Sequence, residues 1–190
     1  TWGKDLTSQQ RSRLAGDAIE IVALGEFGRP TLFVEDGSHA DVVSAIANFM
    51  GKSISVSQCG NATNVKSLYQ YQLSHGRWAN AFFMIDGDNQ GNPYPLDKCF
   101  VHLPYYCIEN LMLDPVTLAQ VCSRSIDEVR SVILDAFKAK RKTIFQKNKF
   151  FEFLADGLTA DHMTFDRLKS FDASLVVADV INALGLSSMQ

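Results

Sequence analysis

Between residues 31 and 103, short apolar segments rich in strand-forming residues alternate with longer segments of helical periodicity. The strand-like segments are Thr31 to Val34, Ser53 to Ser57, Ala81 to Ile85 and Cys99 to Leu103, and the helical ones are residues 39–50 and 62–74. Such alternation is typical of an α/β fold, in which helices flank a mostly parallel sheet. We therefore predict an α/β core over residues 31–113, built on about four strands.

Helical patterns dominate on both sides of this core. Residues 7–25 predict a helix within an N-terminal helix and linker over residues 1–30. After the core, the predicted helices are residues 115–123, 126–142, 150–158 and 173–184. We expect residues 114–190 to form a helical C-terminal extension.

Length and composition limit the classes of protein to which the chain can belong. Its 190 residues suffice for one well-buried domain, and its longest apolar runs are too short to cross a bilayer, so we predict no membrane span. The net charge of −3 does not favour a nucleic-acid binder. The four cysteines contain no CxxC pair, which indicates reduced thiols in a cytoplasmic protein. Because the chain starts at Thr1 without a leader, we expect a piece of a longer polypeptide.

Acidic residues follow two of the predicted strands directly. Glu35 follows the first strand, and Asp86 and Asp88 follow the third, with Gly87 between them. Ligands of α/β sheets bind beyond the carboxyl ends of the strands, and carboxylates are the ligands that Mg²⁺ prefers. The pattern predicts a divalent-metal site. The alternative is a turn rich in Asp, Gly and Asn beside a solvated loop acid.

Glu109 stands among aromatic and aliphatic residues after the fourth strand. A buried charge is costly unless it is paired or coordinated. Glu109 is therefore either a further metal ligand, or a group that orients one, or a carboxylate at the start of a helix.

Much of the positive charge gathers in one predicted helix. The basic residues proposed to contact nucleic acid are Lys138, Lys140, Arg141 and Lys142, and phenylalanines are interleaved with them. Such a run can follow a phosphate backbone. The alternative is the solvated face of an amphipathic helix. The four histidines are isolated in sequence, and we interpret most of them as surface or helix-cap residues.

Three ordered motifs resemble those of a known family. They are Phe33-Val34-Glu35 before a helix, residues 83–88 after the third strand, and the Tyr-Cys-Ile-Glu-Asn-Leu-Met-Leu block at residues 106–113. Together they resemble the TOPRIM domain of topoisomerases, primases and overcoming-lysogenization-defect (OLD) nucleases. The last block is similar to the DUF4435 group of OLD-like TOPRIM proteins. The resemblance covers roughly residues 31–145.

The resemblance implies a TOPRIM-like fold and a set of roles. It implies that Glu35 acts in acid/base chemistry or metal binding, and that Asp86 and Asp88 hold Mg²⁺ or Mn²⁺. It also implies control by an ABC-type ATPase domain or subunit, commonly in antiphage defence. A homo-oligomer stays open as a further partner.

The sequence departs from the family pattern after Glu35. The usual motif reads Val-Glu-Gly, with another acid four residues after the glutamate. Here Asp36 follows the glutamate, glycine is displaced to Gly37, and His39 stands at the fourth position. Asp41 or Asp36 is a candidate for the missing carboxylate. If neither supplies it, the chemistry uses one metal or is degenerate.

These inferences lead to one main functional hypothesis and two alternatives. The main hypothesis is a Mg²⁺- or Mn²⁺-dependent endonuclease domain that hydrolyses DNA or RNA phosphodiesters. The first alternative is a catalytically degenerate TOPRIM-like scaffold that binds a partner or nucleic acid. The second is a haloacid-dehalogenase-type phosphatase, which the position of the Asp86 motif in mid-chain and the presence of Asn89 both disfavour.

Overall fold

The computed structural model describes residues 29–147 and 158–186. The helix predicted at residues 7–25 lies outside the described residues, as does nearly all of the one predicted at 150–158. The described chain divides into two compact units. Residues 29–86 and 91–103 form the first unit, and residues 87–90, 104–147 and 158–186 form the second. The boundary predicted after residue 113 stays a prediction.

The first unit is built on a four-stranded parallel sheet, as predicted. Its strands are β1 (Thr31–Val34), β2 (Ser55–Gln58), β3 (Ala81–Ile85) and β4 (Phe100–His102). They lie in the order β2-β1-β3-β4, and every neighbouring pair is parallel. In the register, Phe33 of β1 pairs with Ser57 of β2 and with Phe83 of β3. The two most continuous apolar strands, β1 and β3, therefore occupy the centre of the sheet.

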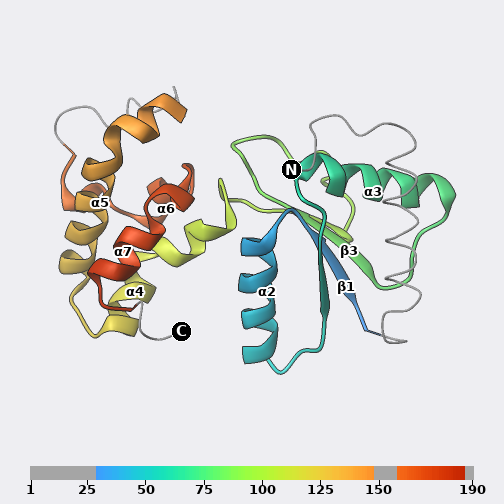
Figure 1. The fold of residues 1–190 in the computed structure, drawn as a ribbon, viewed down its shortest axis with the longest axis horizontal. Helices are drawn as coiled ribbons and strands as arrows, with labels where there is room; N and C mark the ends of the chain where they lie inside the picture. The colour runs from blue at the N-terminus through green and yellow to red at the C-terminus, as the bar shows by residue number, and fades with distance from the viewer. Residues whose placement is uncertain (1–28, 148–157, 187–190) are drawn as a thin grey trace. The chain divides into compact units, whose positions relative to one another are not determined.

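Two helices connect the strands of the sheet. Helix α2 (Gly37–Phe49) connects β1 to β2, and helix α3 (Ala62–His75) connects β2 to β3. The two connections run in opposite directions across the sheet, so right-handed crossovers place the helices on opposite faces. Figure 1 shows the strands lying between α2 and α3.

Aromatic packing fills the α3 side of the sheet. The rings of Phe33 and Phe83 stack with their centroids 5.1 Å apart, and the rings of Tyr69 and Phe100 lie 4.8 Å apart. Tyr69 also donates its hydroxyl hydrogen bond to Asp97, whose carboxylate pairs with Arg77 at 2.6 Å. Burial of such large rings supplies much of the favourable free energy of folding, and it fixes the central strands against α3.

All the regular elements in the described residues of the second unit are helices, which confirms C-terminal helices as predicted, apart from residues 150–158. Its elements are η1 (Ile108–Leu113), α4 (Pro115–Cys122), α5 (Ile126–Lys147), η3 (Ala160–His162), α6 (Phe165–Leu168), η4 (Ala173–Leu175) and α7 (Val177–Ala183). Helix α5 runs past the predicted end at residue 142, since no glycine or proline interrupts it. The core of this unit includes Leu113, Ile133, Phe137 and Phe171. None of the described helices combines the length and the hydropathy that spanning a bilayer requires.

Candidate metal centre

Glu35 and Asp86 lie at the carboxyl ends of the two central strands. Glu35 follows Val34 of β1, and Asp86 follows Ile85 of β3. From β1 the chain continues through α2 to β2 on one side, whereas from β3 it continues to β4 on the other side. Adjacent parallel strands whose connections diverge in this way form a topological switch point, where α/β sheets bind their ligands. The two acids therefore stand where the topology predicts a binding site.

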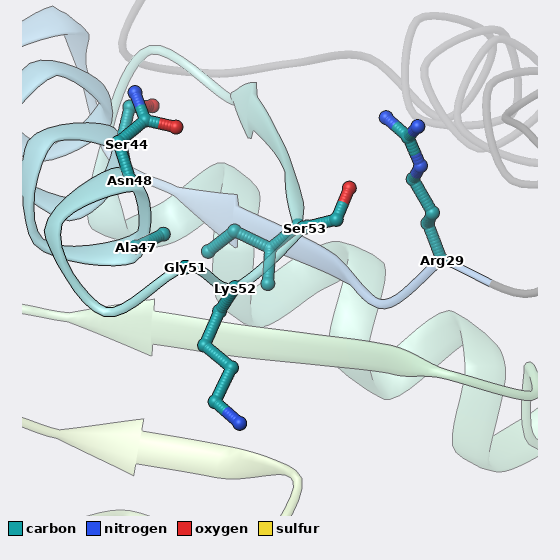
Figure 2. Close-up of a pocket in the computed structure, with 8 residues that line it drawn as sticks. Arg29, Ser44, Ala47, Asn48, Gly51, Lys52 and Ser53 are labelled. Atoms are coloured by element: carbon teal, nitrogen blue, oxygen red, sulfur yellow. The ribbon is translucent and has the colours of Figure 1, made fainter.

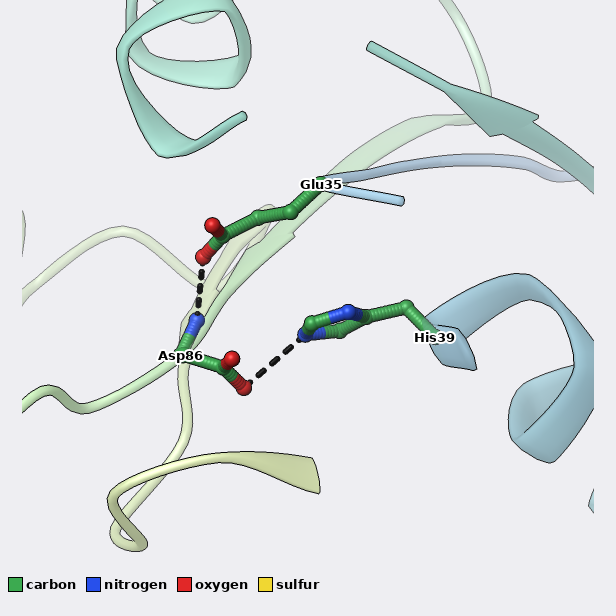
Figure 3. Close-up of side chains that lie close together, drawn as sticks. All are labelled: Glu35, His39 and Asp86. Atoms are coloured by element: carbon green, nitrogen blue, oxygen red, sulfur yellow. Dashed lines mark hydrogen bonds and ion pairs between the residues drawn. The ribbon is translucent and has the colours of Figure 1, made fainter. Parts of the chain in front are cut away.

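A backbone hydrogen bond fixes the Glu35 carboxylate at this point. The Asp86 N–H donates to Oε1 of Glu35 at 2.7 Å, as Figure 3 shows. Both side chains are half-buried. The bond holds the end of β1 to the end of β3, and it directs the carboxylate toward the edge of the sheet.

His39 completes the cluster from the first turn of α2. Its side chain is only 1% exposed. Its Nδ1 lies 3.0 Å from Oδ1 of Asp36, and its Nε2 lies 2.9 Å from Oδ1 of Asp86. An ionised carboxylate only accepts hydrogen bonds, so both ring nitrogens must donate and the ring is an imidazolium ion.

The charges around His39 determine its protonation. Burial disfavours the imidazolium ion, but hydrogen bonds to Asp86 and Asp36, with their negative charges, outweigh burial and raise the pKa of His39 to about 9. Burial likewise opposes ionisation of Asp36, yet hydrogen bonds from His39 and Ser38 hold the pKa of that carboxyl below its usual value. The contacts of His39 with Asp36 and Asp86 therefore favour the charged imidazolium form of the ring.

Glu35, His39 and Asp86 together fit a divalent cation. Each offers one ligand atom, and these atoms all lie within 4.8 Å of one another. Ligand atoms bonded to one ion at about 2.0–2.2 Å lie no more than about 4.4 Å apart, so movements of a few tenths of an ångström would suffice. Two carboxylates and an imidazole are common ligands of such ions. The predicted metal site is thus supported as a Glu35–His39–Asp86 cluster.

Asp88 and Glu109, the other predicted ligands, lie in the second unit. Asp88 and Asn89 adopt left-handed backbone conformations, with φ of 45° and 54°. The N–H of Asp88 donates to the carbonyl oxygen of Tyr106 at 3.0 Å, which ties this turn to the second unit. Glu109 is half-buried in the first turn of η1. Neither belongs to the three-residue cluster found among the described residues, and their roles as ligands stay predictions.

The two candidates for the missing carboxylate differ in position. Asp41 is exposed on α2 and is not in the cluster of the described residues. Asp36 caps the N-terminus of α2, where it accepts the His39 N–H at 3.3 Å, and also contacts the His39 ring. Asp36 therefore contacts the cluster through the histidine.

The residue after Glu109 has a structural task. Asn110 is fully buried, and its Oδ1 accepts the Cys107 N–H at 2.7 Å. Its Nδ2 donates to the carbonyl oxygens of Leu168 and Phe171 at 2.7 and 2.9 Å. The two residues thus differ: Glu109 has a half-buried carboxylate, whereas the amide of Asn110 holds η1 to later segments of the second unit.

The basic run lies on the solvent-facing side of α5. Lys138, Arg141 and Lys142 are exposed, and Lys140 pairs with Asp179 of α7 at 3.3 Å. The opposite side of α5 carries buried residues such as Ile133 and Phe137. This arrangement matches an amphipathic helix, and contact with nucleic acid stays a prediction.

The interpretation of the histidines was wrong for His39. His75 is exposed, and His102 and His162 are half-buried, whereas His39 is buried against two carboxylates. The sequence held one signal: His39 stands four residues after Glu35, where the resembling family carries an acid. A residue at that spacing lies in the first turn of α2, which begins two residues after Glu35.

A polar pocket of about 440 Å³ lies at the opposite edge of the sheet. It is lined by Arg29 and Lys52 together with residues of the C-terminal half of α2, as Figure 2 shows. Arg29 and Ser53 precede β1 and β2, so the pocket lies at the amino ends of these strands. It is therefore separate from the metal cluster at the carboxyl ends.

Comparison with known proteins leaves the family open. No protein-family model matches the chain, and no curated protein and no solved structure matches it. The four-stranded parallel α/β sheet stands on the structure itself, and the narrower TOPRIM and DUF4435 resemblance stands on the sequence motifs alone.

Proposed function

We propose that this chain is a metal-dependent nuclease domain of the OLD-like TOPRIM type, which hydrolyses phosphodiester bonds in DNA or RNA. The observation that carries the proposal is the convergence of Glu35, His39 and Asp86 at the switch point between β1 and β3. The motifs around Glu35 and Asp86, which resemble those of TOPRIM nucleases, supply the substrate class.

Each residue of the cluster has a distinct task. Asp86 and Glu35 provide oxygen ligands, and a divalent cation held there would polarise a phosphate and lower the pKa of bound water. The Asp86 N–H restrains one oxygen of Glu35, which positions this carboxylate to ligate the ion or to accept a proton. His39 would provide the third ligand through its Nε2, which lies 2.9 Å from Oδ1 of Asp86.

Substrate and partner follow from the same resemblance. Lys138, Lys140, Arg141 and Lys142 are the residues proposed to contact the nucleic-acid backbone, because cationic side chains on a solvent-facing helix neutralise phosphates. An ABC-type ATPase domain or subunit is the proposed regulator, in an antiphage-defence setting.

A scaffold without catalytic activity is the second candidate. The observation that favours it is that carboxylates already satisfy both ring nitrogens of His39, so the histidine has its hydrogen-bond partners within the protein. Such a domain would bind a partner or nucleic acid and need no cation.

Cleavage assays on single- and double-stranded DNA and RNA, with Mn²⁺ or Mg²⁺, test the proposal. We expect Glu35→Gln to lower the cleavage rate by about 100-fold or more, because it removes an acid/base group or metal ligand. The matched control is Asp161→Asn, which neutralises an exposed carboxylate on η3 and should leave the rate unchanged.

Two outcomes would contradict the nuclease proposal. Equal cleavage by wild type and Glu35→Gln would remove Glu35 from the chemistry. Absence of cleavage with either metal, together with absence of metal binding, would favour the scaffold.

A further inference from the structure

We propose that the cluster selects a divalent transition metal that accepts an imidazole nitrogen, such as Fe²⁺ or Zn²⁺, over Mg²⁺. This inference rests on the metal site of the proposed function and names the kind of ion that the site takes. It follows from the position of one ring nitrogen.

The His39 Nε2 lies at the spacing of two ligands on one ion. It is 2.9 Å from Oδ1 of Asp86. Two neighbouring ligand atoms bonded to an ion at about 2.1 Å lie about 3 Å apart in an octahedral arrangement. An ion bound to this oxygen on the side that faces the ring would also lie within bonding distance of the imidazole nitrogen. It would replace the proton on Nε2, which would pass to solvent.

Because His39 is buried, its ring has little freedom to move away from an ion bound to Asp86. Its side chain is 1% exposed and is held at both ring nitrogens. Mg²⁺ prefers oxygen ligands and keeps several waters, whereas imidazole suits Fe²⁺ and Zn²⁺. A nitrogen ligand fixed beside two carboxylates thus discriminates against Mg²⁺.

Asp36 orients the imidazole for this role. Its Oδ1 lies 3.0 Å from Nδ1, the ring nitrogen that faces away from Asp86. In protein metal sites, a histidine ligand commonly donates its second N–H to a carboxylate, which fixes the ring and makes the ligating nitrogen more basic. Asp36 is therefore a positioning residue: its carboxylate orients the ring of His39, and His39 is the ligand.

Calorimetric titration tests the proposal, with the purified chain and Zn²⁺, Mn²⁺ or Mg²⁺. All titrations are made at about pH 8, because protonation of the ligands affects metal affinity. We expect wild type to bind Zn²⁺ at least about 100-fold more tightly than Mg²⁺, and more tightly than Mn²⁺. His39→Gln should lose most of this preference. The matched control is His75→Gln, which changes an exposed histidine on α3 and should bind like wild type.

Two further variants separate selectivity from folding. His39→Asp replaces the nitrogen by oxygen, so the preference should shift toward Mg²⁺. Asp36→Asn keeps a good helix cap but removes the charge beside Nδ1, and it should weaken Zn²⁺ binding by about 10-fold. Co²⁺ added to wild type should give visible absorption that differs in the His39→Gln variant, a signature of the ligand set that a folding role would not move.

The outcomes for selectivity and for function are distinguishable. Equal affinity of wild type for Mg²⁺ and Zn²⁺, or unchanged preference in His39→Gln, would overturn this inference and leave a Mg²⁺ nuclease intact. Failure of every ion to bind would overturn the inference and the metal-dependent nuclease together. Selective binding without cleavage would support the inference and contradict the nuclease.

Discussion

His39 carries a positive charge inside the first unit, and two carboxylates stabilise that charge. Asp36 lies on one side of the ring and Asp86 on the other. The charged network explains how a buried ionised histidine is accommodated without an ion. It also makes the stability of the metal-free protein depend on pH.

The pH prediction follows from the sign of the pKa shift. The pKa of His39 is about 9 in the folded chain, above its ordinary value of 6.5. Its contribution to stability should therefore be complete below pH 6.5 and be lost as pH rises through 9. At about 1.4 kcal/mol per pKa unit, the contribution is about 3 kcal/mol.

Urea unfolding of wild type and His39→Gln in a chelator, across this pH range, measures the effect. The stability difference between the two proteins should shrink as pH rises. A constant difference would show that the carboxylates do not stabilise a charged His39.

At the scale of elements, Asn110 joins segments that are distant in sequence. It connects the N-terminus of η1 to the carbonyl oxygens at the end of α6 and before η4. The amide makes three hydrogen bonds in a fully buried position. The Asn of the block at residues 106–113 therefore has a structural explanation, independent of any chemistry at Glu109.

Asn110→Ala should lower the free energy of unfolding by about 3–4 kcal/mol. The change leaves three buried backbone groups without their partner, and each unsatisfied group costs about 1–3 kcal/mol. Asn182→Ala, an exposed position on α7, is the control and should change stability by less than about 0.5 kcal/mol. Chemical denaturation measures both, and similar values for the two variants would refute the structural role.

For the whole molecule, the parallel topology explains why distant residues meet. Glu35 and Asp86 are far apart in sequence, yet adjacent strands bring their carboxyl ends together. The helix that begins after β1 then returns His39 to the same point. The cluster is a consequence of the strand order, because it needs β1 beside β3 and α2 starting between them.

Local sequence patterns predicted the strands and helices, whereas contacts that depend on tertiary packing were harder to predict. The strands and most helices were predictable, since the periodicity of apolar residues is a local signal. The structure adds the caps of α2 and α3, Asp36 and Asn61. The meeting of Glu35 and Asp86 was predictable from the edge rule for parallel sheets. The role of His39 was not recognised, because its burial depends on how α2 packs. A turn after Asp86 was predicted, but its left-handed backbone at Asp88 was not, since its backbone bonds involve distant carbonyl groups.

The central claim is that Glu35, His39 and Asp86 hold one divalent cation. Anomalous scattering from a crystal of the chain soaked in Mn²⁺ tests it most directly. We predict one strong anomalous peak within about 2.0–2.4 Å of a Glu35 oxygen, His39 Nε2 and an Asp86 oxygen. A map with no peak there, and with His39 still hydrogen-bonded to Asp86, would contradict the account.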